Sequence, residues 1–165
     1  MTLNFKQLHP SYIAEVSSID LRQIYDQETL GQIKDAIIQY GVLVFKDQKF
    51  SYEEQLDFGR RLDGELYSHT TLSVLTKNRF ANEALTDISN IDGEGNILKR
   101  EDRRRLDGIC NQIWHTDASF EKISGRYSML FARSVPPVRA NTQFADMRKS
   151  YEDLNAETKW VFLRT

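Results

Sequence analysis

The pattern of hydrophobic positions begins with a short strand and an amphipathic helix. Leu3 to Leu8 favours a strand. An apolar pair, Val16 and Ile19, follows it after a turn. From Asp26 to Tyr40, hydrophobic residues recur three and four positions apart, which is the spacing of one helix face. The residues expected on that face are Leu30, Ile33, Ile37 and Ile38. Asp26 or Gln27 is suited to cap the start of this helix, and Gly41 is suited to end it.

A second strand and a second helix follow directly. Val42 to Phe45 is a compact apolar run of strand length. Ser51 is followed three positions later by Glu54, the pattern of a capping box, in which each side chain hydrogen-bonds the other residue's backbone. The helix that starts there is expected to end near Asp63–Gly64. Its buried face is expected to carry Leu56, Phe58 and Leu62.

Short strands dominate the predictions for the second half of the chain. The predicted strands are Leu85 to Ile88, Tyr127 to Ala132 and Thr142 to Ala145. Asp92 to Asn96 is predicted to be a turn, because glycine and asparagine tolerate positive φ. Tyr151 to Trp160 is predicted to be helical. Helices first and short strands later predict an α+β domain with a β-sandwich or barrel as its core.

Composition and charge leave this picture unchanged. The chain has 165 residues, 40% of them hydrophobic and 28% charged, and its net charge of −2 gives no broad attraction to nucleic acid or anionic membrane. Lys99 to Arg105 is a dense charge run, and an RNA-binding loop is one interpretation of it. Glu101 and Asp102 interrupt the run and no aromatic residues interleave with it, so a solvated loop is favoured.

The compartment is predicted from what the sequence lacks. The single cysteine, Cys110, excludes an internal disulfide framework and fits a reducing compartment, and a secreted protein without disulfides is the alternative. The N-terminus has no basic-then-apolar signal pattern, and no apolar run approaches the roughly 18 residues of a membrane-spanning helix. A cytoplasmic protein with no membrane or nucleic-acid partner is therefore expected, and homo-oligomerisation stays open.

One pair of residues carries recognisable chemistry. His115 and Asp117 are separated by one residue, and on a strand that spacing puts both side chains on the same face. An imidazole and a carboxylate directed at one point can hold a divalent metal, and with a second histidine they form the facial triad of non-haem iron oxygenases. Trp114 and Phe120 are expected in the core. A carboxylate buried among them needs a metal or a cationic partner.

Segments along nearly the whole chain resemble the TauD/TfdA family, and most of all its aryloxyalkanoate-degrading branch. The matching stretches are Val42–Phe45, Asp87–Asn90, Trp114–Phe120, Tyr127–Leu130 and Phe144–Met147. The resemblance implies a dioxygenase that depends on Fe(II) and on 2-oxoglutarate as cosubstrate. It also implies a double-stranded β-helix (jelly roll) with flanking N-terminal helices. Residues 1–165 are then the N-terminal portion of a single domain, truncated after its first strands.

The resemblance implies roles for individual residues. His115 and Asp117 match the first two iron ligands of the family, and Thr142 matches the threonine that hydrogen-bonds a carboxylate of 2-oxoglutarate. Asn111 and His69 match residues that contact substrate in the taurine branch. The plainer interpretations are an ordinary strand residue for Thr142 and loop hydrogen bonding for Asn111 and His69.

Three departures from the family pattern change what is expected. Leu72 stands where the taurine branch has a tyrosine, which argues against taurine as the substrate. Arg139–Ala140 replaces two glycines, so the turn before Thr142 is altered. The second metal histidine and the arginine that binds 2-oxoglutarate lie far downstream in the family. His9 does not match that histidine, and neither does His69.

Two functions therefore stay open. The first is hydroxylation of a small organic acid, aryloxyalkanoate-like or sulfonate-like, with O2 consumed and succinate and CO2 released. The second is a catalytically inactive fragment of such an enzyme, which lacks the distal histidine and arginine and acts at most as a binding or interaction module.

Overall fold

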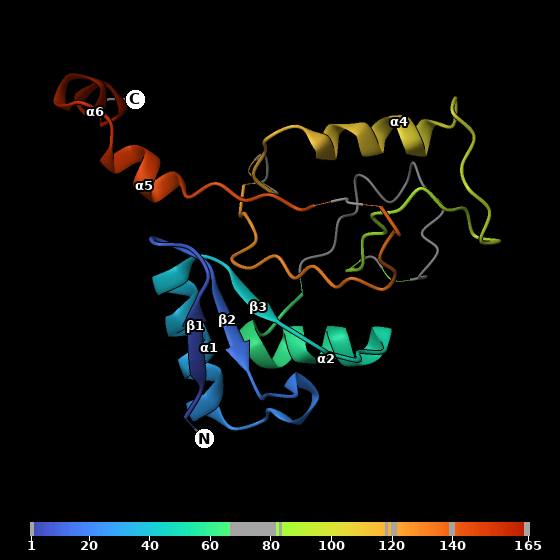
Figure 1. Cartoon of the computed structure of the whole chain (residues 1–165), viewed down its shortest axis with the longest axis horizontal. Helices are drawn as coiled ribbons and strands as arrows, with labels where there is room; N and C mark the ends of the chain where they lie inside the picture. Colours follow the sequence, from blue (N-terminus) through green and yellow to red (C-terminus); the bar gives the residue numbers. More distant parts are fainter. Residues whose placement is uncertain are drawn as a thin grey trace. The chain divides into compact units, whose positions relative to one another are not determined.

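The computed structural model describes residues 2–66, 82, 84–117, 119, 122–138 and 141–163. The chain divides into two compact units. The first unit comprises residues 1–50 and 132–165, and the second unit comprises residues 51–131. Figure 1 shows the elements of each.

The first unit contains a three-stranded sheet in the order β1-β2-β3 (Figure 1). β1 (Asn4–Gln7) pairs antiparallel with β2 (Ala14–Ser17), and β2 pairs parallel with β3 (Leu43–Phe45). Parallel neighbours need a crossover connection. Here the crossover consists of the 3-10 helix η1 (Leu21–Gln23) and the helix α1 (Gln27–Tyr40). The strand expected at residues 3–8 and the one at 42–45 are confirmed.

Apolar side chains of the sheet and of α1 form the core of the first unit. In β2 the burial alternates, with Ala14 and Val16 buried and Glu15 and Ser17 half-buried. Leu30 and Ile33 of α1 are each only 1% exposed. Ile38, expected on the same face, is 69% exposed, so that prediction is wrong. Successive residues turn by about 100° around a helix, which carries Ile38 past the edge of the buried stripe.

The ends of α1 and α2 follow the capping signals. The Asp26 carboxylate accepts a hydrogen bond from the Thr29 backbone N–H at 2.8 Å, which lowers the pKa of Asp26. Gly41 ends α1 with a φ of 71°. α2 (Tyr52–Asp63) begins with the predicted capping box. Glu54 N–H donates to Ser51 Oγ at 3.1 Å, and Ser51 N–H donates to Glu54 Oε2 at 2.7 Å.

The second unit contains the buried face of α2 and the turn predicted at residues 92–96. Leu56, Phe58 and Leu62 are buried, as predicted. In the predicted turn, Asp92 N–H donates to the Asn96 carbonyl at 2.8 Å, and the backbone N–H of Asn96 donates to Asp92 Oδ1 at 2.9 Å. That second bond lowers the pKa of Asp92. Gly95, at a φ of 89°, completes the turn.

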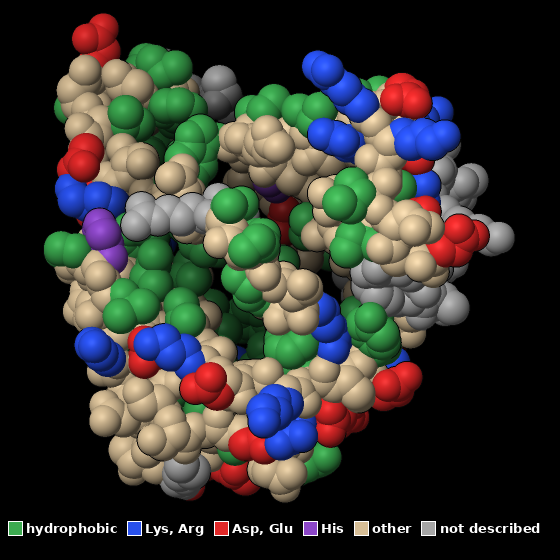
Figure 2. Space-filling model, turned by 45° about the vertical axis from the view of Figure 1, so that its right-hand side comes forward, with side chains coloured by type: hydrophobic (Ala, Val, Ile, Leu, Met, Phe, Trp, Pro, Cys, Tyr) green, Lys and Arg blue, Asp and Glu red, His purple; other side chains and the backbone are tan. Residues whose placement is uncertain are grey.

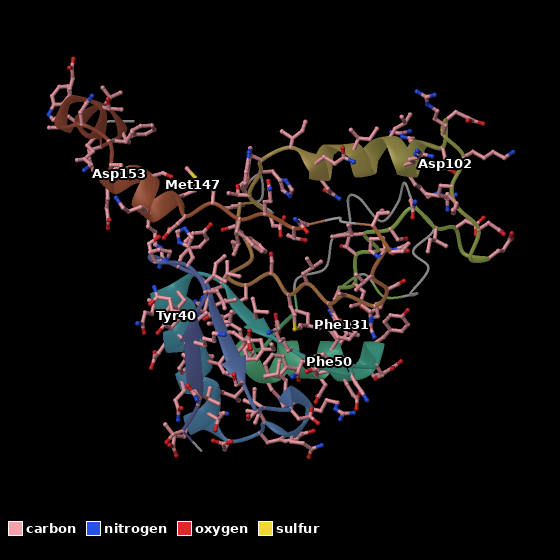
Figure 3. The ribbon with its side chains drawn as sticks, in the orientation of Figure 1. Tyr40, Phe50, Asp102, Phe131, Met147 and Asp153 are labelled. Carbon is pink, nitrogen blue, oxygen red and sulfur yellow. The ribbon has the colours of Figure 1, made fainter. Side chains whose placement is uncertain are left out.

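The solvated loop predicted for residues 99–105 is partly wrong, because α4 (Arg103–Ile109) begins inside it. Asp102, labelled in Figure 3, initiates this helix. Its carbonyl accepts from Leu106 N–H at 3.1 Å, and its carboxylate accepts from Arg104 N–H at 2.9 Å. The 3-10 helix η2 (Cys110–Gln112) continues from α4.

The strands predicted at 85–88, 127–132 and 142–145 are wrong. In the part of the chain that the structure describes, none of these segments belongs to a β-ladder. A strand is defined by hydrogen bonds to a neighbouring strand, so hydrophobic alternation alone does not produce one.

The helix predicted at 151–160 is two helices, α5 (Met147–Glu152) and α6 (Ala156–Phe162). The break has a local cause: Asn155 accepts from Thr158 N–H at 2.8 Å and caps a new helix. Met147, the first residue of α5, and Asp153, its C-cap, are labelled in Figure 3. Within the described ranges, every helix is too short or too polar to cross a membrane.

Candidate metal site

His115 and Asp117 lie in the second unit, on an irregular segment after η2. Strand alternation therefore does not bring them together; a turn at Asp117 does. His115 Nε2 lies 3.3 Å from Asp117 Oδ1. The two side chains thus direct one nitrogen and one oxygen at each other.

Hydrogen bonds hold the far atom of each side chain. His115 Nδ1 lies 2.7 Å from the backbone carbonyl of Ile113. A proton on Nδ1 donates to that carbonyl, which leaves the lone pair of Nε2 available. On the other side, the Ser128 hydroxyl donates to Asp117 Oδ2 at 2.7 Å. The atoms that face each other, Nε2 and Oδ1, are therefore the ones suited to bind a ligand.

The separation of these two atoms fits a shared divalent cation. Neighbouring ligands of an octahedral ion lie about 3 Å apart when each bond is about 2.1 Å long. The 3.3 Å between His115 Nε2 and Asp117 Oδ1 is close to that value. The same distance suits an ion pair when Nε2 is protonated.

The surroundings of the pair are more open than its sequence context predicts. The side chain of His115 is 47% exposed and that of Asp117 is 62% exposed. Trp114, expected in the core, is 67% exposed, so that prediction is wrong, and Phe120 lies outside the described residues. Burial in apolar surroundings is therefore not a reason for this carboxylate to need a cation. The reason is the short approach of His115 Nε2 to Asp117 Oδ1, because two lone pairs at this distance favour a cation between them.

The other predicted site residues are distributed over both units. Asn111 is exposed in η2 of the second unit, and Thr142 is exposed on an irregular segment of the first unit. His69 lies outside the described residues. Among the residues that the structure describes, no group of three or more His, Cys, Asp and Glu is placed to hold a metal. The structure thus brings together His115 and Asp117 and adds no further ligand of these types from the described ranges.

Two anchors hold the segment around Thr142 within the first unit. The Tyr12 hydroxyl donates to the Phe144 carbonyl at 2.8 Å. Arg148 Nη1 donates to the Ile38 carbonyl at 2.6 Å, near the C-terminal end of α1. Sequence reasoning missed both contacts, because they join positions more than a hundred residues apart. Sequence reasoning also missed the role of Ser128. The available signal was a polar hydroxyl within an otherwise apolar run of residues.

Comparison with known proteins adds a family and several relatives. The family model described as "Taurine catabolism dioxygenase TauD, TfdA family" matches residues 4–165. An alpha-ketoglutarate-dependent 2,4-dichlorophenoxyacetate dioxygenase of Cupriavidus pinatubonensis is 36% identical over 154 residues, covering 93% of this chain and 53% of the relative. The protein of that name from Burkholderia sp. is 32% identical over 159 residues, covering 96% and 53%.

A solved structure is similar over nearly the whole chain. The crystal structure of AAD-2 in complex with Mn(II) and N-oxalylglycine has a TM-score of 0.81 and 33% identity, covering 96% of this chain and 52% of that one. The chain spans about half the length of the curated relatives it matches.

Proposed function

We infer, because this chain belongs to the TauD/TfdA family of dioxygenases, that it supplies the first two metal ligands of an Fe(II)- and 2-oxoglutarate-dependent dioxygenase. The observation that carries this proposal is the 3.3 Å approach of His115 Nε2 to Asp117 Oδ1. Each of these side chains is held through its other polar atom by a hydrogen bond. Such hydrogen bonds fix the orientation of both side chains before an ion binds, as a well-formed metal centre requires.

The proposed substrate is a small organic acid of the aryloxyalkanoate kind, with a sulfonate-like acid as second choice. Two relatives that are 32% and 36% identical are named for 2,4-dichlorophenoxyacetate. Asn111, exposed in η2 four residues before His115, is the proposed substrate contact within the described residues. His69 is proposed as a second contact by family resemblance alone.

Iron and 2-oxoglutarate, when bound, supply the oxidising chemistry that hydroxylates a C–H bond with O2 and releases succinate and CO2. The chain's own residues bind and orient. His115 would hold the ion through Nε2, and Asp117 would hold it through Oδ1. The hydroxyl of Thr142 would donate a hydrogen bond to a carboxylate of 2-oxoglutarate, and the anchors from Tyr12 and Arg148 hold the segment that carries Thr142.

The proposed architecture places the three-stranded sheet and its helices at the flank of a double-stranded β-helix. Residues 1–165 are then the N-terminal portion of one domain. The half-length match to the curated relatives supports this proposal.

The second candidate function is a catalytically inactive fragment that binds at most a metal or a partner. It is favoured by the absence of a third ligand of the usual types from the described residues. Two ligands hold a divalent ion less tightly than a complete facial triad does. This candidate predicts metal binding that depends on His115, without turnover.

One experiment separates the two candidates. The chain is incubated with Fe(II), 2-oxoglutarate and 2,4-dichlorophenoxyacetate, and succinate is measured against a control without protein. The enzyme hypothesis expects succinate that is lost in His115→Ala and retained in His9→Ala, a matched histidine in an exposed N-terminal turn. Succinate at the control level in every sample supports the fragment. Turnover that is unaffected by His115→Ala contradicts the proposed site.

A further inference from the structure

We propose that Ser128 is a positioning residue for the metal site, which fixes the Asp117 carboxylate so that Oδ1 faces His115. This inference rests on the proposed function, because it assigns Asp117 to a metal ion. It concerns a residue that touches neither ion nor substrate and acts through a ligand.

The contact has the geometry of a strong hydrogen bond. Ser128 Oγ lies 2.7 Å from Asp117 Oδ2, the short distance typical of a hydroxyl that donates to a carboxylate. Eleven residues separate the two positions, so the bond closes a loop rather than a local turn. With its side chain 62% exposed, Asp117 has little apolar packing to fix its rotamer. The serine hydroxyl therefore contributes much of the orientation of this carboxylate.

The two proposed ligands are supported in the same way. The Ile113 carbonyl lies 2.7 Å from His115 Nδ1, and the Ser128 hydroxyl lies 2.7 Å from Asp117 Oδ2. In each ligand the atom away from the metal is hydrogen-bonded, and the atom toward the metal is left for coordination. Groups of this kind fix the direction of a ligand, and removing one lowers metal affinity by about 10- to 100-fold.

The hydrogen bond would also influence how Asp117 binds a metal ion. Oδ2 accepts the hydrogen bond of the Ser128 hydroxyl, which would make Oδ2 a poorer metal ligand than Oδ1. Removing the hydroxyl would leave Oδ2 free to bind as well.

The test uses Co²⁺ as the probe with the 165-residue chain. Binding is followed by the visible absorption of the ion and by the shifted proton resonances of the His115 ring. The variants are Ser128→Ala, which removes the hydroxyl, and Ser128→Thr, which keeps it. The matched control is Ser119→Ala, since Ser119 lies on the same loop and donates to the Thr116 carbonyl at 3.4 Å. His115→Ala reports on the site itself.

The expected result is that Ser128→Ala weakens Co²⁺ binding by about 10-fold or more and alters the absorption spectrum, whereas Ser128→Thr and Ser119→Ala stay within about threefold of the parent chain. Thermal unfolding of Ser128→Ala is expected to match that of Ser119→Ala. A loss of stability in Ser128→Ala that Ser128→Thr does not restore assigns the serine a purely structural role and overturns the inference.

The remaining outcomes separate this inference from the proposed function. If His115→Ala loses Co²⁺ while Ser128→Ala binds like the parent, the metal site stands and the role of Ser128 is wrong. If the parent and His115→Ala bind Co²⁺ equally, or neither binds it, the proposed metal site fails and the inference fails with it.

Discussion

Residues 2–63 and residues 84–163 differ in how they bury their apolar side chains. Among the described residues, the buried hydrophobic set lies in the first region except for Leu98. In the second region Ile113, Trp114 and Val135 are 67 to 77% exposed. Figure 2 shows hydrophobic side chains reaching the surface.

The difference shows where local and tertiary signals agree. In the first region capping residues, strand alternation and the helix stripe all favour the same packing, which is the condition for a stable, unique fold. In the second region the same kinds of signal predict strands that have no ladder among the described residues. The candidate metal site lies in that second region. Its side chains are held by hydrogen bonds rather than by apolar packing.

The largest expected difference between the regions is in the free energy of unfolding that is lost when a leucine is truncated to alanine. Leu30→Ala removes a side chain that is 1% exposed and should lower the free energy of unfolding by about 2–5 kcal/mol. Leu130→Ala, at a position 61% exposed, should change it by less than about 0.5 kcal/mol. Urea denaturation followed by circular dichroism measures both. Equal losses in the two variants would mean that Leu130 is as well packed as Leu30.

Helix caps give the next comparison, because the same chemistry occurs in both regions. Ser51→Ala removes the capping box of α2 and should lower stability by about 1 kcal/mol. Ser51→Asp should retain most of the stability that the cap contributes, since an aspartate side chain also caps a helix. Asn155→Ala removes the cap of α6, a helix with no buried residues, so global unfolding should be nearly unchanged. A larger effect at Asn155 than at Ser51 would show that α6 contributes to the cooperative core.

A smaller effect is expected at a strained backbone position of the first region. Ser18 has a φ of 59°, which L-residues adopt at a cost and glycine adopts freely. Ser18→Gly should therefore raise the free energy of unfolding by up to about 1 kcal/mol. The neighbouring Ser17 lies in β2, opposite Asn4, and Ser17→Gly should lower stability. Thermal unfolding of the two variants tests the opposite signs.

The smallest expected effect is a pH dependence at the start of α1. The backbone N–H of Thr29 lowers the pKa of Asp26 in the folded chain. A lowered folded pKa gives stability that is present above the unfolded pKa and is lost as the pH falls through the folded value. Asp26→Asn keeps a capping oxygen but cannot titrate. Its deficit in Tm should therefore shrink between about pH 6 and about pH 2. A constant deficit would show that the charge of Asp26 is irrelevant.

The sequence predicts those features whose causes are local. Asp26, Ser51 and Gly41 cap helices through hydrogen bonds and φ values that involve only a few neighbouring residues. His115 and Asp117 are recognisable as a candidate metal-binding pair because their chemistry and spacing are visible without a fold. The boundary between α5 and α6 is also local, because Asn155 caps α6, but the prediction of a single helix at 151–160 overlooked this signal.

Features that depend on distant residues could not be predicted. The contact of Ser128 with Asp117 follows from the path of an irregular segment, which hydrophobic periodicity does not specify. Strand assignments at 127–132 and 142–145 failed because a ladder needs a second strand in register. The exposure of Trp114 was missed for a related reason, since burial depends on what packs against a residue.

The contact between Arg148 and the Ile38 carbonyl has a consequence for the order of folding. It spans 110 residues, so it can form only after the chain has left the first unit and returned. Contacts of such separation close large loops and form late, whereas β1, β2, α1 and β3 lie within the first 50 residues. A Cβ at Gly41 would lie 3.0 Å from Arg148 Nη2, so the residue that ends α1 also leaves room for the guanidinium. During synthesis the three-stranded sheet and α1 can therefore assemble first. The space beside Gly41 then remains available for the Arg148 guanidinium, which is synthesised later.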